Sequence, residues 1–135
     1  MYNRAVENRA CNEIEVIISQ AEKSPMQYRH GAALIKKGKI LGKGYNIFCL
    51  PASSKMKNLF LPNRKRPSIH AEMSCLKGLR HDQIRGSTVY VVRLSRSGEL
   101  KLSFPCKRCI SLLTRKGIKK VMYSKNDGSF GAIYL

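Results

Sequence analysis

The chain alternates between segments with the periodicity of helices and segments with the periodicity of strands. Apolar residues at helical spacing predict helices, whereas short β-branched or alternating runs predict strands. The expected helices are residues 7–23, 68–79 and 106–116, and the expected strands are residues 30–35, 40–48, 88–94 and 118–124. This order implies an α/β fold, a layered sheet with helices packed against it. The last two β–α–β crossovers are expected to be parallel and right-handed.

Turn residues separate these segments. Ser24-Pro25 ends the first helix, because proline cannot continue it. Gly38 predicts a hairpin between the first two strands, and Gly117 is expected at the end of the last helix. Residues 95–103 are expected to extend the strand before Pro105 into a hairpin. Residues 49–68 have weak periodicity and predict a long loop.

The length of 135 residues fits a single domain, which we expect to span residues 1–135. No run approaches the roughly 18 apolar residues that a membrane span needs. The first ten residues lack the apolar stretch of a signal peptide, so we expect a cytoplasmic protein that is not secreted. The five cysteines are an odd number, which argues against a disulfide framework.

Two short fragments carry residues that can bind a metal. His70-Ala71-Glu72 begins one predicted helix, and Pro105-Cys106-Lys107-Arg108-Cys109, 36 residues after the histidine, begins another. The two cysteines are three positions apart, so both sulfurs can reach one ion from a first helical turn. Zinc takes thiolate and imidazole ligands in a tetrahedral array. With His70 as the third ligand, one position stays open, which is typical of catalytic zinc sites.

Glu72 is placed to move a proton beside such an ion. Residues two apart point to different sides in mid-helix, but at a helix N-terminus both can turn toward a ligand off the end of the axis. The N–H groups and positive dipole there favour thiolates and hydroxide. A carboxylate beside zinc-activated water can act as a general base and then as a general acid. These residues by themselves predict a zinc hydrolase.

Other stretches accompany the two fragments: His30–Ile35, Gly44-Tyr45-Asn46, Ser68–Met73 and Gly117–Val121. H-x-E followed by P-C-x-x-C is a signature of zinc nucleobase deaminases. Together these stretches resemble the cytidine and deoxycytidylate deaminase superfamily over about residues 5–125, which we take as the core. The resemblance implies a three-layer α/β/α cytidine-deaminase-like fold. It also implies Zn²⁺ on His70, Cys106 and Cys109, with Glu72 as the catalytic proton shuttle.

The resemblance further implies hydrolytic deamination of cytosine to uracil in a cytidine- or deoxycytidylate-type nucleotide. Asn46 matches the family position that contacts the sugar. We also expect Ala71 to contact the substrate. The family usually has a further helix, and often a strand, after the segment that ends near Ser124. Here only a short apolar tail of about eleven residues remains. A homo-oligomer is one expectation, because a second copy could cover the sheet edge left by this short C-terminus.

The net charge of +18, from 26 Lys and Arg against 8 Asp and Glu, attracts phosphate-bearing ligands and polyanions. The loop over residues 49–68 holds five basic residues with aromatic residues nearby, a pattern that suits phosphates and unstacked bases. We expect Arg64, Lys65 and Arg66 to contact substrate, and Tyr123 to stack on or flank a base. The alternatives are a solvated loop or a nuclear-localisation-like run, which would place the protein in the nucleus.

Three functions stay open on the sequence. The first is deamination of a free cytosine nucleotide such as deoxycytidylate. The second is deamination of cytosine, or adenine, in single-stranded DNA or RNA. The third is a non-catalytic, zinc-stabilised nucleic-acid-binding module. Glu72 argues against the third, because a purely structural metal does not need it. The resemblance also favours cytosine over adenine, because the similar compact tRNA adenosine deaminases have a short connection where residues 95–103 are long.

Overall fold

The computed structural model describes residues 4–48 and 68–135, with side chains from residue 12 onward in those ranges. Its elements are α1 (Arg4–Glu22), β1 (Arg29–Lys36), β2 (Lys39–Tyr45), β3 (Ile47–Phe48), β4 (Ser68–Ile69), α3 (Ala71–Ser74), α4 (His81–Ile84), β5 (Thr88–Leu94), β6 (Leu100–Lys101), α5 (Lys107–Arg115), β7 (Lys120–Ser124) and β8 (Phe130–Tyr134). The predicted loop contacts Arg64, Lys65 and Arg66 lie outside the described residues. Within those residues, no helix is long and apolar enough to cross a membrane.

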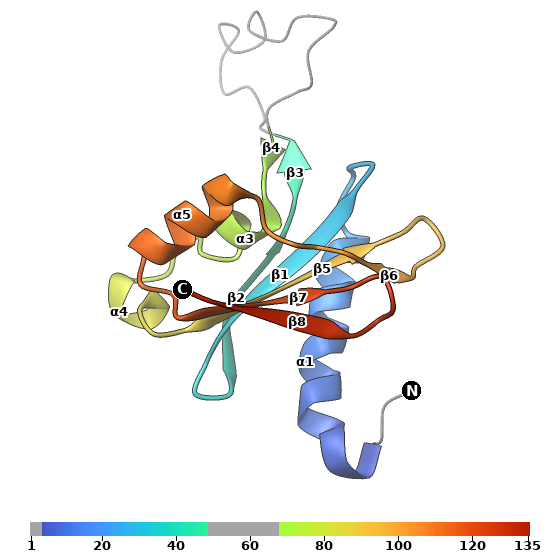
Figure 1. Cartoon of the computed structure of the whole chain (residues 1–135), viewed down its shortest axis with the longest axis horizontal. Coiled ribbons are helices and arrows are strands. Elements are labelled where there is room, and N and C mark those ends of the chain that lie inside the picture. Colours follow the sequence, from blue (N-terminus) through green and yellow to red (C-terminus); the bar gives the residue numbers. More distant parts are fainter. Residues whose placement is uncertain (1–3, 49–67) are drawn as a thin grey trace, which may run out of the picture.

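The strands β2, β1, β5, β7 and β8 form one sheet in that order, and β6 pairs with β5 (Figure 1). The crossover from β5 through α5 to β7 is parallel, as expected. The preceding crossover joins β2 to β5, which run in the same direction but are not neighbours. Strand β1 lies between them and is antiparallel to both. The sheet is therefore mixed.

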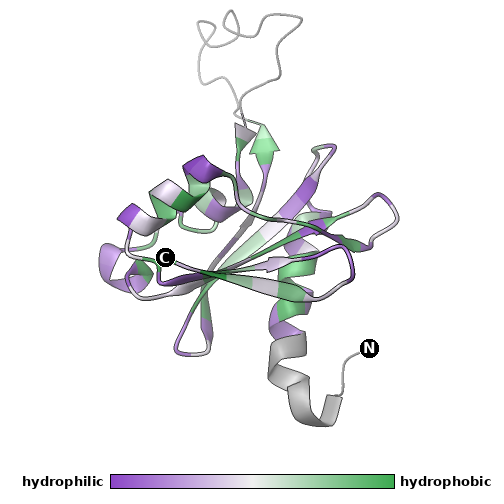
Figure 2. Ribbon diagram, in the orientation of Figure 1, coloured by the Kyte–Doolittle hydropathy of each residue, from purple (hydrophilic) through white to green (hydrophobic). Residues whose placement is uncertain are grey.

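Helices cover both faces of the sheet, which confirms the three-layer α/β/α arrangement (Figure 1). Side chains alternate between the two faces along each strand. On one face Ala32 and Val91 pack in a cluster with residues of α3, α4 and α5. On the other face Ala33 and Val92 pack against Ile17 and Ala21 of α1. The central strands β1 and β5 therefore bury apolar side chains on both faces of the sheet. Figure 2 shows hydrophobic residues along these strands.

The predicted hairpins form where the sequence places them. Lys37 and Gly38 both have positive φ, 51° and 72°, as the two-residue turn between β1 and β2 requires. Residues 95–103 contain the turn after β5 and the strand β6. Arg93 of β5 pairs with Lys101 of β6, which completes the second hairpin. Both outcomes follow from local turn chemistry, which the sequence carries directly.

Three segments differ from the predicted elements. The strand expected over residues 40–48 is split at Asn46 into β2 and β3, and β3 pairs with β4 in a separate two-stranded sheet. This pairing takes Ser68 and Ile69 out of the helix predicted over residues 68–79, where α3 spans only Ala71–Ser74 and is followed by turns. The short α4 was not predicted, because four residues carry little periodicity.

The C-terminal tail completes the sheet. Phe130–Tyr134 forms β8, which runs antiparallel to β7 with Tyr123 opposite Gly131. A turn at Asn126-Asp127-Gly128 joins the two strands, and the Asp127 carboxylate accepts from the Ser129 backbone N–H. No strand was predicted for this apolar tail, and it forms the edge strand of the sheet.

Candidate metal centre

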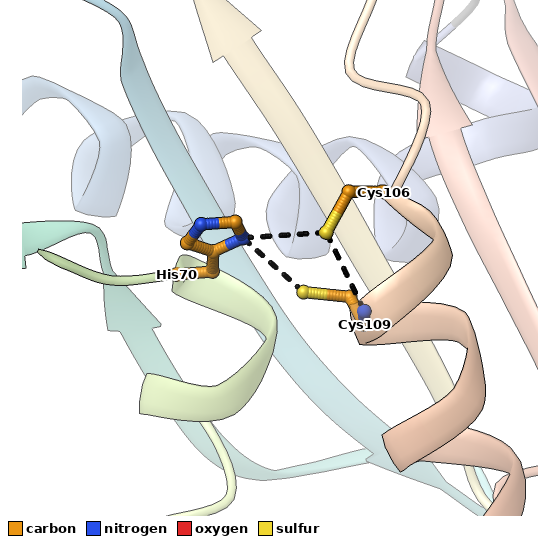
Figure 3. A group of neighbouring side chains, drawn as sticks. All are labelled: His70, Cys106 and Cys109. Carbon is orange, nitrogen blue, oxygen red and sulfur yellow. Dashed lines mark hydrogen bonds between the residues drawn. The ribbon is translucent and has the colours of Figure 1, made fainter. Parts of the chain in front are cut away.

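The N-termini of α3 and α5 lie close together beside the sheet. His70 immediately precedes α3 and Cys106 immediately precedes α5, both in extended conformation, with ψ of 152° and 162°. Cys109 lies in the first turn of α5. The structure brings the predicted ligand atoms of these three residues within 4.8 Å of one another (Figure 3). His70 Nδ1 lies 3.2 Å from Cys109 Sγ and 3.8 Å from Cys106 Sγ.

The donor set fits zinc in kind and in spacing. Zinc bonds of 2.0–2.3 Å in a tetrahedron place neighbouring donors about 3.4–3.8 Å apart, close to the observed distances. Two soft sulfur donors and one imidazole nitrogen suit zinc rather than magnesium or calcium, which prefer oxygen ligands. Within the described residues no fourth His, Cys or carboxylate joins the group. The three ligands therefore leave a coordination position for a non-protein ligand.

Glu72 is buried beside this group, with 5% of its surface exposed. Burial raises the pKa of its carboxyl, and its own backbone N–H, the charge of His70 and a hydrogen bond from the Cys109 thiol offset part of the increase. Burial also raises the pKa of the Cys109 thiol, and the Glu72 charge adds to that effect. A carboxyl with a raised pKa is suited to accept and return a proton near neutral pH.

Two glycines of β2 position α3. Gly42 and Gly44 pair with Leu34 and Ala32 of β1, on the face that α3 covers. A Cβ on Gly44 would lie 2.6 Å from Ser74 Oγ and 2.8 Å from the Ser74 carbonyl carbon, and one on Gly42 would overlap the Cys75 carbonyl oxygen. The helix that carries His70 and Glu72 therefore packs directly on the β2 backbone. Glycine inside a predicted strand was the available signal.

Two buried serines position the segment that leads into α5. Ser103 Oγ donates to the Val91 carbonyl at 2.9 Å, and Ser124 Oγ donates to the Lys101 carbonyl at 2.6 Å. The Ser124 backbone N–H donates in turn to Ser103 Oγ at 2.8 Å. These bonds tie residues 101–103 to β5 and β7 just before Cys106. This network was not predictable from the sequence, because nothing local distinguishes these serines from loop serines.

The other predicted substrate contacts are placed differently. The Asn46 side chain is buried and engaged within the chain: Oδ1 accepts from Ser24 Oγ at 2.6 Å and from the His30 N–H at 2.8 Å, and Nδ2 donates to the Tyr28 carbonyl at 2.7 Å. Its contact with a sugar stays a prediction. Ala71 is the first residue of α3 and its side chain lies in the core cluster, and its contact with substrate also stays a prediction.

Tyr123 lies at the end of β7, where its ring meets the Phe104 ring edge-on at 5.0 Å. Phe104 is 55% exposed and lies two residues before Cys106. Neither ring lines the cleft of about 170 Å³ at the metal ligands, which is lined by Ser68, Ile69, His70, Met73, Arg108, Cys109 and Leu112. The stacking role predicted for Tyr123 stays a prediction.

Comparison with known proteins adds a family and a fold. The family model described as the cytidine and deoxycytidylate deaminase zinc-binding region matches residues 7–125. No curated protein matches the chain. The structure is similar to dCMP deaminase from the cyanophage S-TIM5 in complex with dCMP and dUMP, with 20% identity over 95% of this chain and 90% of that chain and a TM-score of 0.53.

Two further solved structures share the fold. Cytidine deaminase from Mycobacterium leprae is 20% identical over 87% of each chain, with a TM-score of 0.51. RibD from Acinetobacter baumannii is 19% identical over 87% of this chain, with a TM-score of 0.53. The present chain spans 28% of the length of that RibD chain. At these identities the likeness establishes the fold.

Proposed function

Because this chain belongs to the cytidine and deoxycytidylate deaminase zinc-binding family, we propose that it is a hydrolytic deaminase that converts cytosine to uracil in a cytidine- or deoxycytidylate-type nucleotide. One observation carries the proposal: three zinc-type donors converge from two helix starts, with a buried carboxyl beside them. A purely structural ion would need no such carboxyl.

The chain supplies a preformed metal site. The packing of α3 on β2 fixes the position of His70. The hydrogen bonds of Ser103 and Ser124 fix the segment that precedes Cys106. Cys106 Sγ also accepts the Cys109 backbone N–H at 3.4 Å, so this sulfur is oriented from within its own helix. When bound at these residues, zinc supplies the Lewis acidity that makes water a nucleophile near neutral pH.

Glu72 carries the protons of the proposed reaction. Its carboxyl takes a proton from the attacking water and delivers it to N3 of the ring as the water oxygen bonds to C4. It then passes the second proton to the departing amine, so that the C4–N bond breaks and ammonia leaves. Burial keeps this carboxyl out of bulk water, and its raised pKa lowers the free-energy difference between its two protonation states.

A second candidate is the same chemistry on cytosine, or adenine, in single-stranded DNA or RNA. The net charge of +18 favours it, because a polyanion gains more from such a field than a mononucleotide does. Two exposed aromatic residues, Tyr28 and Phe104, are also suited to stacking on bases, and Phe104 lies two residues before Cys106.

The test is to incubate zinc-loaded protein with deoxycytidylate, cytidine and a cytosine-containing single strand at low and moderate salt, and to measure ammonia. We expect ammonia release, which Glu72→Gln lowers by at least about 100-fold while retaining one zinc per chain. Turnover of the strand alone, falling steeply with salt, would select the second candidate. If no substrate is deaminated, both candidates fail, and loss of zinc from Glu72→Gln would mean that its role is misassigned.

A further inference from the structure

Three polar side chains lie on the face of the sheet that α3 and α5 cover. Alternation along the strands places His30, Arg93 and Tyr123 on the same face as Ala32, Val91 and Val121, which pack beneath α3 and α5. His30 is directly opposite Arg93 across β1 and β5, and Val91 is opposite Tyr123 across β5 and β7. These residues form a floor beside the two helix starts.

Arg93 supplies the positive charge among these three residues. Its side chain is partly buried, and its guanidinium carbon lies 5.4 Å from the centre of the Tyr28 ring. In the described part of the chain, ion pairs join Arg80 to Asp82 and Lys101 to Glu99, and no carboxylate pairs with Arg93. A partly desolvated guanidinium stacked on an aromatic ring and lacking a carboxylate is well suited to bind an anion.

His30 links Arg93 to the metal ligands. The His30 backbone N–H donates to Asn46 Oδ1 at 2.8 Å, and Asn46 leads directly into β3, which pairs with β4 just before His70. His30 is therefore opposite Arg93 across the sheet and is connected through Asn46 to the segment that carries a metal ligand. An anion bound at Arg93 would lie on the face of the sheet that α3 and α5 cover, a placement compatible with a nucleotide whose base is at the reacting centre.

We propose that Arg93, oriented by stacking on Tyr28, binds the phosphate of the substrate and so selects phosphorylated cytosine compounds over the nucleoside. The inference rests on the proposed function and names the substrate class of the same site. A planar guanidinium matches phosphate oxygens in bidentate geometry. The phosphate can belong to a mononucleotide or to a phosphodiester strand, because the two present the same anionic oxygens.

The test measures the binding of reaction products, which needs no turnover. Zinc-loaded protein is titrated calorimetrically with dUMP, with deoxyuridine and with a short single strand containing one uracil. Arg93→Gln is compared with Arg93→Lys and with Arg96→Gln, a matched control that removes the same charge from the exposed turn between β5 and β6. Thermal denaturation of each variant reports whether it is folded.

We expect Arg93→Gln to weaken dUMP binding by roughly 10–100-fold, the range of a lost charge-assisted hydrogen bond, and to leave deoxyuridine binding unchanged. Arg93→Lys should recover part of the loss, and Arg96→Gln should bind both ligands as the parent protein does. A dependence on Arg93 seen with the strand but not with dUMP would support the inference with a phosphodiester as the source.

Equal weakening of dUMP and deoxyuridine would overturn the inference, because a structural role acts on both ligands alike. Unchanged binding of dUMP and of the strand would overturn it too, as would a parent protein that binds neither. If dUMP binding depends on Arg93 but dCMP is never deaminated, the proposed function fails while the phosphate site stands.

Discussion

Replacing Gly44 by alanine tests whether direct packing of α3 on β2 holds the metal centre together. A Cβ at this position would lie 2.8 Å from the carbonyl carbon of Ser74, whereas ordinary contact begins at 3.4 Å. The Ser74 hydroxyl can rotate away, but the backbone carbon cannot. Helix α3 must therefore move from β2 by about 0.6 Å (3.4 − 2.8). His70 precedes α3, so its imidazole moves relative to the two sulfurs on α5.

This displacement is large for a metal site. Zinc–ligand distances are held to within about 0.2 Å, so a shift of this size strains or breaks the bond to His70. Changes in the residues that support metal ligands typically lower metal affinity by about 10–100-fold, and we expect Gly44→Ala to fall in that range. Overpacking should also lower the free energy of unfolding by about 1–3 kcal/mol.

Gly31→Ala is the matched control. Its Cβ would lie 2.5 Å from the backbone nitrogen of Ala21, so it crowds α1 on the opposite face of the sheet. We expect a comparable loss of stability in urea denaturation, with zinc affinity close to that of the parent protein in competition with a chromophoric chelator. The reasoning is refuted if Gly44→Ala binds zinc as the parent does, or if Gly31→Ala loses as much affinity.

Three further outcomes are expected. Cys109→Ala should lower the zinc content from one ion per chain to none, measured by atomic emission after dialysis, because two donors remain. Ser124→Ala should lower the free energy of unfolding by about 1–3 kcal/mol in urea denaturation, because the Lys101 carbonyl and the Arg93 N–H lose a buried partner. Chelation of zinc from the parent protein should lower its melting temperature but leave its far-ultraviolet circular dichroism unchanged, since zinc at 100 times its Kd contributes about 2.7 kcal/mol.

The elements that local chemistry specifies were predictable from the sequence. Helix α5 lies within the predicted range, because Cys106 accepts a backbone N–H as its N-cap and Gly117 has the positive φ of 85° that ends it. The two motif fragments likewise indicated that His70, Cys106 and Cys109 converge. Their spacing and order along the chain carried that information without any knowledge of the sheet.

What depends on pairing between distant strands was not predictable in this way. Ser68 and Ile69 have helical neighbours in the sequence but pair with β3, which shortens α3. Arg93 lies opposite His30 only because β5 pairs with β1 in this register. The hydrogen bonds of the Asn46 amide with Ser24 and His30 likewise join residues distant in the sequence, while its contact with a sugar stays a prediction.

X-ray absorption at the zinc edge, on protein loaded with one equivalent of metal, tests the zinc site most directly. Coordination by His70, Cys106 and Cys109 predicts two sulfur ligands at about 2.3 Å and nitrogen or oxygen ligands at about 2.0–2.1 Å, with one sulfur lost in Cys106→Ala if metal is retained. A shell of three or four sulfurs, a shell without sulfur, or failure to bind one zinc per chain would contradict the site.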